Sequence, residues 1–490
     1  MNILFVASEV APFAKTGGLG DVSGALPKAL KKLGHEIKLV MPRYYDIKRD
    51  KLEKLPISLG VDMGSLGELW AGVYRGYLPK SKVEIYFLEH EGFFGRSGLY
   101  DENGFAYDDN AIRFIFLSKA SLVLSKALNF KPDIIHANDW HSASIPILLK
   151  TLYLKDEFFK ETSSILTIHN LQHQGNFDKS VINILSVGWE HFTPLELEAM
   201  DRVNLLKGGI AFCDAFNTVS KKYSHEIQTS EFGFGLQEHI QAHSYKLFGI
   251  LNGVDYDEWS PAVDKYLVKN FDIDSFNGKK ECKKDLQKAF RLPIKAKTLL
   301  IGFVGRLVEQ KGIGLIASVI EGLMDLDIQI VMLGSGEKWA EGFFSEVASR
   351  YHDKFGCYIG YNNKLAHKIE AGSDIFLMPS LFEPCGLNQI YSLRYGTLPI
   401  VRATGGLDDT IENYDKQKDK GNGFKFLFAT PDALYHTIKW AVQTYYNERD
   451  DFKMMQLRAM REHFSWIDAA SKYEDIYKSL YYPKKIQRYK

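Results

Sequence analysis

The sequence predicts an α/β protein made of two Rossmann-like domains of mainly parallel sheet. Short apolar, β-branched runs alternate with longer amphipathic stretches, the pattern of parallel strands connected by helices. These runs are apolar throughout rather than at alternate positions, so both sheet faces are expected to be buried. The 490 residues exceed what one hydrophobic core usually holds. One sheet would need about a dozen strands, near the limit for an open twisted sheet, which favours two domains.

The strands are predicted in order along the chain, in two groups. In the first half they are residues 3–7, 36–41, 83–88, 133–136, 164–168, 215–219 and 248–251. A helix is predicted over residues 22–33, and Gly34 follows it as a typical C-cap residue. After residues 252–255 the pattern begins again, with strands predicted at 299–304, 329–333, 356–359, 375–378 and 398–401.

The domain boundaries follow from this restart. We predict a first domain over residues 1–256, joined by a C-terminal helix over 466–490, and a second domain over 257–465. The polar, lysine-rich stretch 257–293 is interpreted as the connection into the second domain, with a surface helix at 279–290. Trp466, Tyr473 and Tyr477 predict a packed face on the C-terminal helix.

Charge and cysteine content exclude several classes of protein. The 61 basic and 61 acidic residues balance, which removes the general argument for a nucleic-acid partner or an anionic membrane. The four cysteines are far apart and have no metal-ligand spacing, so neither a disulfide framework nor a metal site is predicted. The N-terminal apolar run is short and lacks a basic start, and no apolar stretch is long enough to span a bilayer. We therefore expect a soluble, cytoplasmic protein.

A glycine-rich loop follows the first predicted strand, with the sequence Lys15-Thr16-Gly17-Gly18-Leu19-Gly20-Asp21. Glycines let a ligand approach the backbone, and unpaired N–H groups at the start of the next helix attract phosphate or sugar oxygens. Lys15 adds a positive charge. The spacing is neither G-x-G-x-x-G nor a Walker A loop, so dinucleotide and ATPase functions are not supported. By itself, the loop is equally consistent with an ordinary turn carrying a surface lysine.

Polar residues also follow three strands of the second domain, at the sheet edge where ligands bind in such folds. Arg306 and Lys311 come after strand 299–304, and two cations there can stabilise a departing diphosphate in place of a metal ion. The alternative is solvated surface charge. After strand 375–378, Glu383 can hold sugar hydroxyls, and the amides of Cys385, Gly386 and Leu387 begin a helix. Cys385 is interpreted as a small buried residue, because no basic residue adjoins it in sequence. Thr404 and Gly405 end the next strand in the same manner.

Three histidines follow strands of the first domain. His169 ends strand 164–168 and is predicted to face the ligand, and Asp139 is predicted to share that role. His136 and His141 lie on either side of Asp139. A zinc site is conceivable, but the HxxxxH spacing without an intervening Glu or a cysteine is weak evidence for it. Both are therefore interpreted as structural.

Taken together, these segments resemble the bacterial and plant glycogen/starch synthase family. The matching stretches occur in the family's order and are residues 15–22, 136–141, 167–171, 251–255, 306–307 with 310–312, and 382–387. KTGGLGDV at 15–22 and FEPCGL at 382–387 are together highly specific. The chain departs from the family pattern at Asn138, where histidine is common, at Gly305, where serine is common, and in a shortened glycine-rich loop at 233–235. These departures concern acceptor preference.

The resemblance implies a GT-B fold, in which the two domains face a deep cleft. It also implies a retaining transfer of glucose from ADP-glucose to the non-reducing end of an α-1,4-glucan such as glycogen, without a cofactor or metal. The implied catalytic residues are His169, Arg306, Lys311 and Glu383. Donor binding is implied for Lys15, Gly17, Gly18, Tyr361 (against the base), Cys385, Gly386, Leu387, Thr404 and Gly405. Sugar or acceptor binding is implied for Glu9, Asp21, Asp139 and Asn252.

Two other functions stay open at this point. One is a GT-B glucosyltransferase that uses UDP-glucose, since the choice of ADP depends on the resemblance alone. The other is a catalytically inactive glucan-binding protein, whose mark would be the loss of Lys15, Arg306, Lys311 or Glu383; all four are present. Glycogen phosphorylase would need a pyridoxal-phosphate lysine and a much longer chain. The sequence does not predict the oligomeric state.

Overall fold

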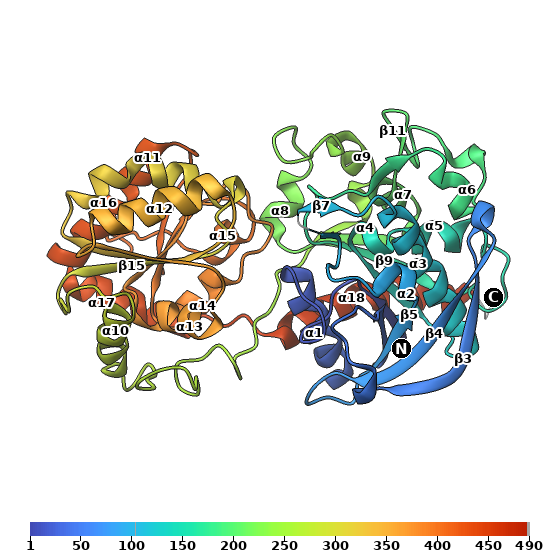
Figure 1. Ribbon diagram of the computed structural model, residues 1–490, viewed down its shortest axis with the longest axis horizontal. Coiled ribbons are helices and arrows are strands. Elements are labelled where there is room, and N and C mark those ends of the chain that lie inside the picture. Colours follow the sequence, from blue (N-terminus) through green and yellow to red (C-terminus); the bar gives the residue numbers. More distant parts are fainter. Residues whose placement is uncertain (103, 488–490) are drawn as a thin grey trace. The chain divides into compact units, whose positions relative to one another are not determined.

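The computed structural model describes residues 1–102 and 104–487. The chain divides into two compact units, Met1–Asn252 with the segment from Trp466 onward, and Gly253–Ser465 (Figure 1). The first unit ends four residues before the boundary expected at 256. The last three residues of the predicted helix 466–490 lie outside the described residues.

The first unit contains a nine-stranded sheet in the order β14-β13-β9-β8-β1-β2-β5-β4-β3. Its strands are β1 (Asn2–Val6), β2 (Glu36–Pro42), β3 (Glu53–Asp62), β4 (Glu68–Tyr77), β5 (Glu84–Glu89), β8 (Ile134–Asn138), β9 (Ser163–Ile168), β13 (Ala215–Thr218) and β14 (Leu247–Gly249). All seven predicted strands are present, and they pair in parallel. Their order reverses between β1 and β8, which makes that point the switch point of a Rossmann-type sheet.

The sequence missed β3 and β4; the edge strand β3 pairs antiparallel with β4, and β4 pairs antiparallel with β5. Both strands expose about every second residue at their paired ends, so they lack the continuous apolar run that identified the other strands. Two minor sheets were also not predicted. They contain β6 (Asp101–Glu102) with β7 (Phe105–Ala106), and β10 (Asn176–Asp178) with β12 (Arg202–Asn204) and β11 (Glu198–Ala199).

The helices of the first unit come from both segments of the chain that form it. They are α1 (Gly18–Lys32), α2 (Glu91–Phe94), α3 (Asn110–Ala127), α4 (Asp139–Ser142), α5 (Ser144–Lys150), α6 (Val181–Leu185), α7 (Leu205–Phe212), α8 (Lys221–Glu226), α9 (Gln237–Ala242) and α18 (Trp466–Gln487). Helix α1 begins four residues before the predicted start, inside the glycine loop. Helix α18 packs on α1. Its buried Tyr477 lies 2.6 Å from His136 Nδ1, and its buried Tyr473 accepts a hydrogen bond from Asn217. The predicted packed face is therefore present, and His136 is structural as expected.

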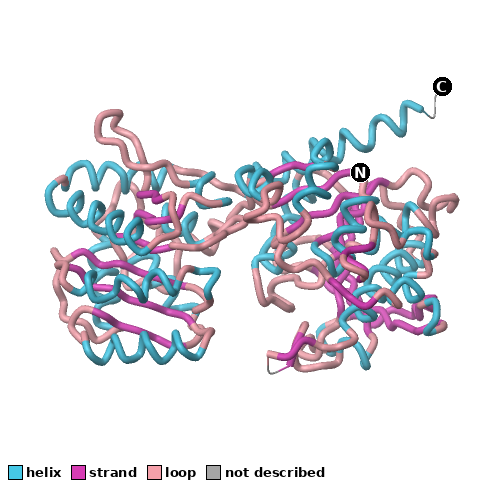
Figure 2. Tube along the Cα trace, turned by 90° about the horizontal axis from the view of Figure 1, so that it is seen from above, coloured by secondary structure: helices cyan, strands magenta, loops and turns pink. Residues whose placement is uncertain are grey.

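The second unit is a parallel six-stranded sheet in the order β17-β16-β15-β18-β19-β20. Its strands are β15 (Leu299–Val304), β16 (Ile328–Gly334), β17 (Phe355–Ile359), β18 (Ile375–Met378), β19 (Leu398–Arg402) and β20 (Phe424–Phe426). In Figure 2 these strands run side by side between helices. The helices are α10 (Gly278–Ala289), α11 (Ile313–Met324), α12 (Lys338–Arg350), α13 (Asn363–Gly372), α14 (Asn388–Arg394), α15 (Gly405–Thr410), α16 (Pro431–Asn447) and α17 (Arg449–Arg461). Only β20 was missed, because three residues are too short to show a pattern. The switch point lies between β15 and β18.

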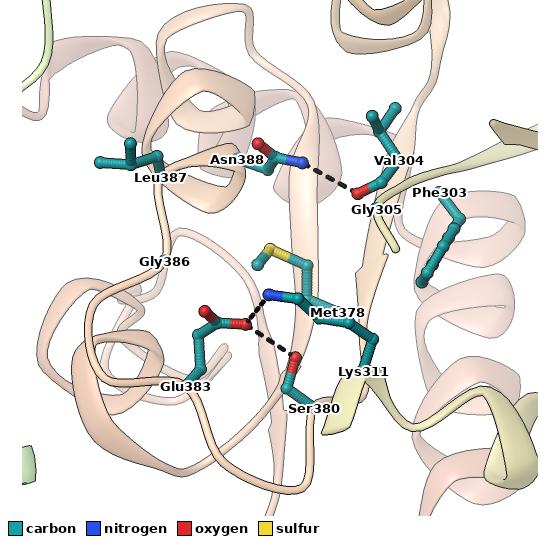
Figure 3. A pocket seen from close by; sticks show the side chains of 10 residues that line it. All are labelled: Phe303, Val304, Gly305, Lys311, Met378, Ser380, Glu383, Gly386, Leu387 and Asn388. Carbon is teal, nitrogen blue, oxygen red and sulfur yellow. Dashed lines mark hydrogen bonds and ion pairs between the residues drawn. The ribbon is translucent and has the colours of Figure 1, made fainter. Parts of the chain in front are cut away.

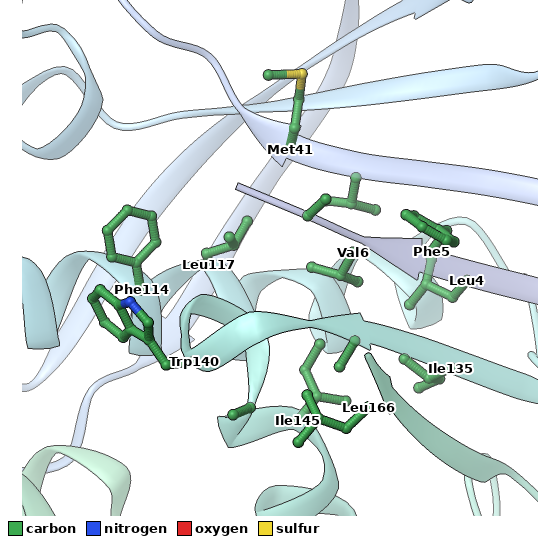
Figure 4. Packing of buried hydrophobic residues seen from close by; sticks show 14 of the residues in the cluster. Leu4, Phe5, Val6, Met41, Phe114, Leu117, Ile135, Trp140, Ile145 and Leu166 are labelled. Carbon is green, nitrogen blue, oxygen red and sulfur yellow. The ribbon is translucent and has the colours of Figure 1, made fainter. Parts of the chain in front are cut away.

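Each unit has its own hydrophobic core. In the first unit, β1 lies between β2 and β8, and Phe5 and Val6 are fully buried (Figure 4). Leu117 of α3 and Leu166 of β9 are fully buried in the same cluster. This burial on both sheet faces holds the strand ends in place. None of the described helices is both long and apolar enough to cross a bilayer.

Candidate active site

The switch point of the second unit brings together the loops that follow β15 and β18. The Leu381 N–H donates to the Gln310 carbonyl at 2.8 Å, and the Gln310 side chain donates to the Phe382 carbonyl at 3.3 Å. Gly312 lies between the two loops with φ = 71°, and a Cβ there would lie 2.1 Å from the Pro379 carbonyl oxygen. Only glycine permits both this conformation and this close approach.

Lys311 and Glu383 face each other across these loops (Figure 3). Lys311 Nζ lies 2.5 Å from Glu383 Oε2, and the Ser380 hydroxyl donates to the same oxygen at 3.0 Å. The Glu383 side chain is 8% exposed and that of Lys311 is 21% exposed. A cavity of about 210 Å³ opens beside them, and it is lined by Phe303, Val304, Gly305, Lys311, Met378, Ser380, Glu383, Gly386, Leu387 and Asn388. The pair therefore presents an oriented carboxylate and a cation to one small cavity.

A third loop, at the end of β19, packs behind Glu383. Gly405 begins α15 with φ = 47°, and a Cβ there would lie 1.9 Å from the Glu383 carbonyl oxygen. The next amide, of Gly406, donates to that oxygen at 3.1 Å. Thr404 and Cys385 are both buried, so Cys385 is packed as the sequence predicted. Gly405 thus supports the loop that carries Glu383.

Arg306 and Tyr361 also follow strands of this sheet, but both lie on the surface. Arg306 donates to the Gln310 side chain at 3.2 Å. Tyr361 is 81% exposed and bonds only weakly to Asn363, at 3.3 Å. Within the described part of the chain, neither residue hydrogen-bonds to Lys311 or Glu383. The structure therefore brings Lys311 and Glu383 into direct contact, and it leaves Arg306 and Tyr361 exposed to solvent.

The glycine loop lies at the switch point of the first unit, and Glu9 organises it. The Glu9 carboxylate accepts hydrogen bonds from the Thr16 amide at 2.6 Å, the Thr16 hydroxyl at 2.7 Å and the Gly17 amide at 3.1 Å. The Tyr100 hydroxyl donates to it at 2.7 Å. Glu9 is 4% exposed. Its carboxylate is therefore committed to holding the loop, in addition to any contact with a sugar.

The rest of the loop is open. Lys15 Nζ lies 2.6 Å from Asp21 Oδ1, and both side chains are partly exposed. Burial raises the pKa of Asp21, and the pairing with Lys15 offsets part of that rise. A Cβ at Gly17 or Gly18 would meet no atom within 4 Å. No neighbouring protein atom requires glycine at these two positions, and the space above them is free for a ligand.

Asp139, which follows β8 and begins α4, lies beside His169, which follows β9. Asp139 Oδ1 accepts a hydrogen bond from the His169 amide at 2.7 Å, and His169 Nε2 lies 3.0 Å from Asn138 Oδ1. Burial raises the pKa of Asp139 to about 7 and lowers the pKa of His169 to about 3. Near neutral pH, His169 is therefore an uncharged hydrogen-bonding group. Asn252 is also buried, and no described residue donates to its Oδ1.

Replacing Asp139 by asparagine tests the raised pKa. Since the pKa of Asp139 lies above its ordinary 3.8, the stability that its protonated form provides is present at low pH and is lost as pH rises through 7. Asparagine is uncharged, can accept the same hydrogen bond and tolerates the backbone φ of 53°. The difference in unfolding free energy between Asp139→Asn and wild type is expected to shift in favour of the variant by on the order of 1–4 kcal/mol from about pH 5 to about pH 8. Urea denaturation of both proteins at both pH values measures this shift. The same difference in unfolding free energy at about pH 5 and about pH 8 would contradict the raised pKa of Asp139. The exposed Asp432→Asn is the control.

Sequence reasoning missed Tyr100, Ser380 and Asn388. Tyr100 holds Glu9 from 91 residues away, a separation at which no local pattern exists. Asn388 donates to the Val304 carbonyl at 2.9 Å and so joins α14 to β15. Ser380 lies in the loop already singled out for Glu383. Its polar side chain, two residues after β18, was the available signal.

Comparison with known proteins agrees with this architecture. The starch synthase catalytic domain family matches residues 2–242, and the group 1 glycosyl transferase family matches residues 285–454. The solved catalytic domain of starch synthase IV from Arabidopsis thaliana, bound to ADP and acarbose, matches with a TM-score of 0.89 and 32% identity, covering 98% of this chain and 99% of that one. The protein is thus a glycosyltransferase with the two-domain GT-B fold.

Two curated relatives narrow the class. Glycogen synthase 1 of Geobacter sulfurreducens is 53% identical and covers 97% of this chain and 96% of the relative. Glycogen synthase 1 of Geobacter metallireducens is 50% identical, and the match covers 97% of this chain and 95% of that relative. The chain belongs to the glycogen synthase family. Across residues 1–102 and 104–487, no three His, Cys, Asp or Glu side chains are placed to hold a metal ion.

Proposed function

We propose that this enzyme elongates glycogen by transferring glucose, with retention of configuration, from ADP-glucose to the non-reducing end of an α-1,4-glucan. The observation that carries the proposal is the Lys311–Glu383 pair beside the cavity at the second switch point. Its relatives carry the name glycogen synthase, and a starch synthase of the same fold was solved with ADP and the oligosaccharide acarbose. We place the reaction in the cytoplasm.

The charges of the second unit suit a nucleotide sugar. In this proposal Lys311 and Arg306 neutralise the diphosphate as it departs, which is the role that a metal ion takes in other enzymes. Glu383, oriented by Lys311 and Ser380, accepts hydrogen bonds from sugar hydroxyls. The amides of residues 385–387 precede α14 and face the phosphate, and Tyr361 packs on the base. Thr404 and Gly405 support this donor site from behind.

The first unit supplies the remaining groups. Lys15 and the open backbone at Gly17 and Gly18 are proposed to contact the donor, in a loop whose shape Glu9 maintains. Asp21, Asp139 and Asn252 are assigned to the sugar and acceptor. His169, uncharged near neutral pH, hydrogen-bonds the reacting sugar without repelling a developing positive charge at its anomeric carbon.

We favour a front-face route for the transfer. The bond from the anomeric carbon to the ADP oxygen breaks as the bond to the acceptor O4 forms, and the acceptor's hydroxyl proton passes to the leaving phosphate. The Glu383 carboxylate already accepts hydrogen bonds from Lys311 and Ser380, and a carboxylate held in this way is better suited to binding a sugar than to acting as a free nucleophile. A trapped glucosyl adduct on Glu383 would overturn this route.

Transfer of radiolabelled glucose into glycogen tests the function. The purified protein is assayed with ADP-glucose and with UDP-glucose at equal concentrations. The expected result is incorporation with a clear preference for ADP-glucose. Preference for UDP-glucose would replace the donor assignment, and glycogen binding without incorporation from either donor would identify an inactive glucan-binding protein.

A further inference from the structure

Strands β3 and β4 form a hairpin at the edge of the first unit's sheet (Figure 1). In its register Gly60 pairs with Trp70, Ser58 with Gly72, and Asp62 with Glu68. Because alternate residues of a strand share one face, these six residues lie on the same side. The residues between them, Leu59, Val61 and Ala71, are buried on the opposite side, where α3 packs.

Trp70 is exposed on this outer face between two glycines. Its cross-strand neighbour Gly60 and its same-strand neighbour Gly72 have no side chains, and Trp70 is 57% exposed. A Cβ placed on Gly60 would lie 3.4 Å from Trp70 Cη2 and 2.0 Å from Glu68 Oε1. The Glu68 carboxylate therefore occupies the space over Gly60 and would have to move if that residue had a side chain, whereas the edge of the Trp70 ring lies at ordinary contact distance from it. This leaves one side of the ring open to solvent with a carboxylate at its edge.

We propose that this surface, the Trp70 face (Ser58, Gly60, Asp62, Glu68, Trp70 and Gly72), binds a chain of the glucan acceptor outside the active site. The apolar side of a pyranose ring fits an open indole surface, and its hydroxyls donate to carboxylates. Two of the six residues are acidic and none is basic, and the neighbouring Glu89, which lies beside Gly72, is already paired with Arg43 and Arg49. The unpaired charge on the face is therefore negative, which disfavours phosphates, nucleic acids and other polyanions. An uncharged polyhydroxylated polymer is the ligand whose chemistry matches both the ring and the charges.

The inference depends on the proposed function, because the same α-glucan is the acceptor. A polymer carries many chain ends. Holding one branch on the Trp70 face raises the effective concentration of the others near the enzyme. A short oligosaccharide cannot occupy two sites at once and gains nothing from the second. The Trp70 face should therefore affect reactions with glycogen and leave those with maltotriose unchanged.

Electrophoresis through gels containing glycogen tests binding directly. Trp70→Ala is expected to weaken the affinity for glycogen by about 2- to 12-fold, the range of aromatic contact energies. The KM for glycogen should rise by a similar factor, while kcat and the KM for maltotriose stay at wild-type values. Glu68→Gln, which keeps the indole, should give a smaller loss. The matched control is Trp339→Ala, since Trp339 is 49% exposed on α12 of the second unit and should leave glycogen binding unchanged.

Three outcomes would overturn the inference. The first is unchanged glycogen binding in Trp70→Ala. The second is an equal loss with maltotriose, which would mean that Trp70 acts through the fold or the active site. The third is a wild-type dimer that Trp70→Ala converts to a monomer in gel filtration, which would identify the β3 edge as a contact between copies of the chain. If the wild type transferred no glucose and Trp70→Ala still lost glycogen binding, the proposed function would fail and the Trp70 face would be supported.

Discussion

Replacing Glu383 by alanine is expected to lower kcat for glucose transfer by about 10²- to 10³-fold, the usual loss for one preorganised polar group in a catalytic site. The carboxylate is held by Lys311 at 2.5 Å and by Ser380 at 3.0 Å, so its position beside the cavity is well defined. Alanine leaves the Lys311 ammonium, 21% exposed, able to reach water, so the chain should still fold. Initial rates with radiolabelled ADP-glucose and glycogen measure the loss, and circular dichroism confirms the fold.

Two further variants separate the charge of Glu383 from its position. Glu383→Gln keeps the shape and removes the charge, and it should be nearly as inactive as alanine if the charge is needed. Ser380→Ala keeps the charge and removes one neutral hydrogen bond, so a loss of about 10-fold or less is expected. An alanine variant within about threefold of wild type would remove Glu383 from the catalytic site.

Replacing Lys311 by alanine is expected to lower kcat by a similar factor and also to destabilise the protein by about 3 kcal/mol. The second effect arises because Glu383, 8% exposed, would remain buried without its cation. Urea denaturation measures the stability, and the radiolabel assay measures the rate. The double variant Lys311→Ala with Glu383→Ala should be less impaired than the sum of the single changes, because the two side chains act as one unit.

Arg306→Ala is the matched control for this pair. Arg306 is exposed and bonds only to Gln310 among the described residues, so its loss should slow transfer but leave the unfolding free energy within about 0.5 kcal/mol of wild type. Equal destabilisation by both substitutions, or strict additivity in the double variant, would contradict the role given to the Lys311–Glu383 contact.

Much of the fold and several site positions were predictable because they depend on local sequence. Continuous apolar runs identified all seven parallel strands of the first sheet and five of the six in the second. Residues directly after such strands, including Lys311 and Glu383, must lie at one edge of the sheet. Their proximity in the structure follows from the strand order, in which β15 and β18 are neighbours.

The contacts that span long sequence separations were not predictable. The resemblance assigned Glu9 to the sugar, but nothing in the sequence indicated that Tyr100, 91 residues away, also holds its carboxylate in the glycine loop. The Lys15–Asp21 pair was also not predicted, although both residues were singled out. Strands β3 and β4 escaped detection because their apolar residues alternate and one side stays exposed. The Trp70 face exists only because the hairpin register places Gly60 opposite Trp70.

The sequence by itself determined the class of fold, the two-part organisation and the loops that carry the polar residues, because strand burial and turn chemistry are encoded over a few consecutive residues. Tertiary structure alone decided which of those residues touch. It joined Lys311 to Glu383, committed Glu9 to the glycine loop, left Arg306 and Tyr361 on the surface and opened the outer side of Trp70. Each of these outcomes depends on strand order, register and close approach at glycines, which are properties of segments far apart in the chain.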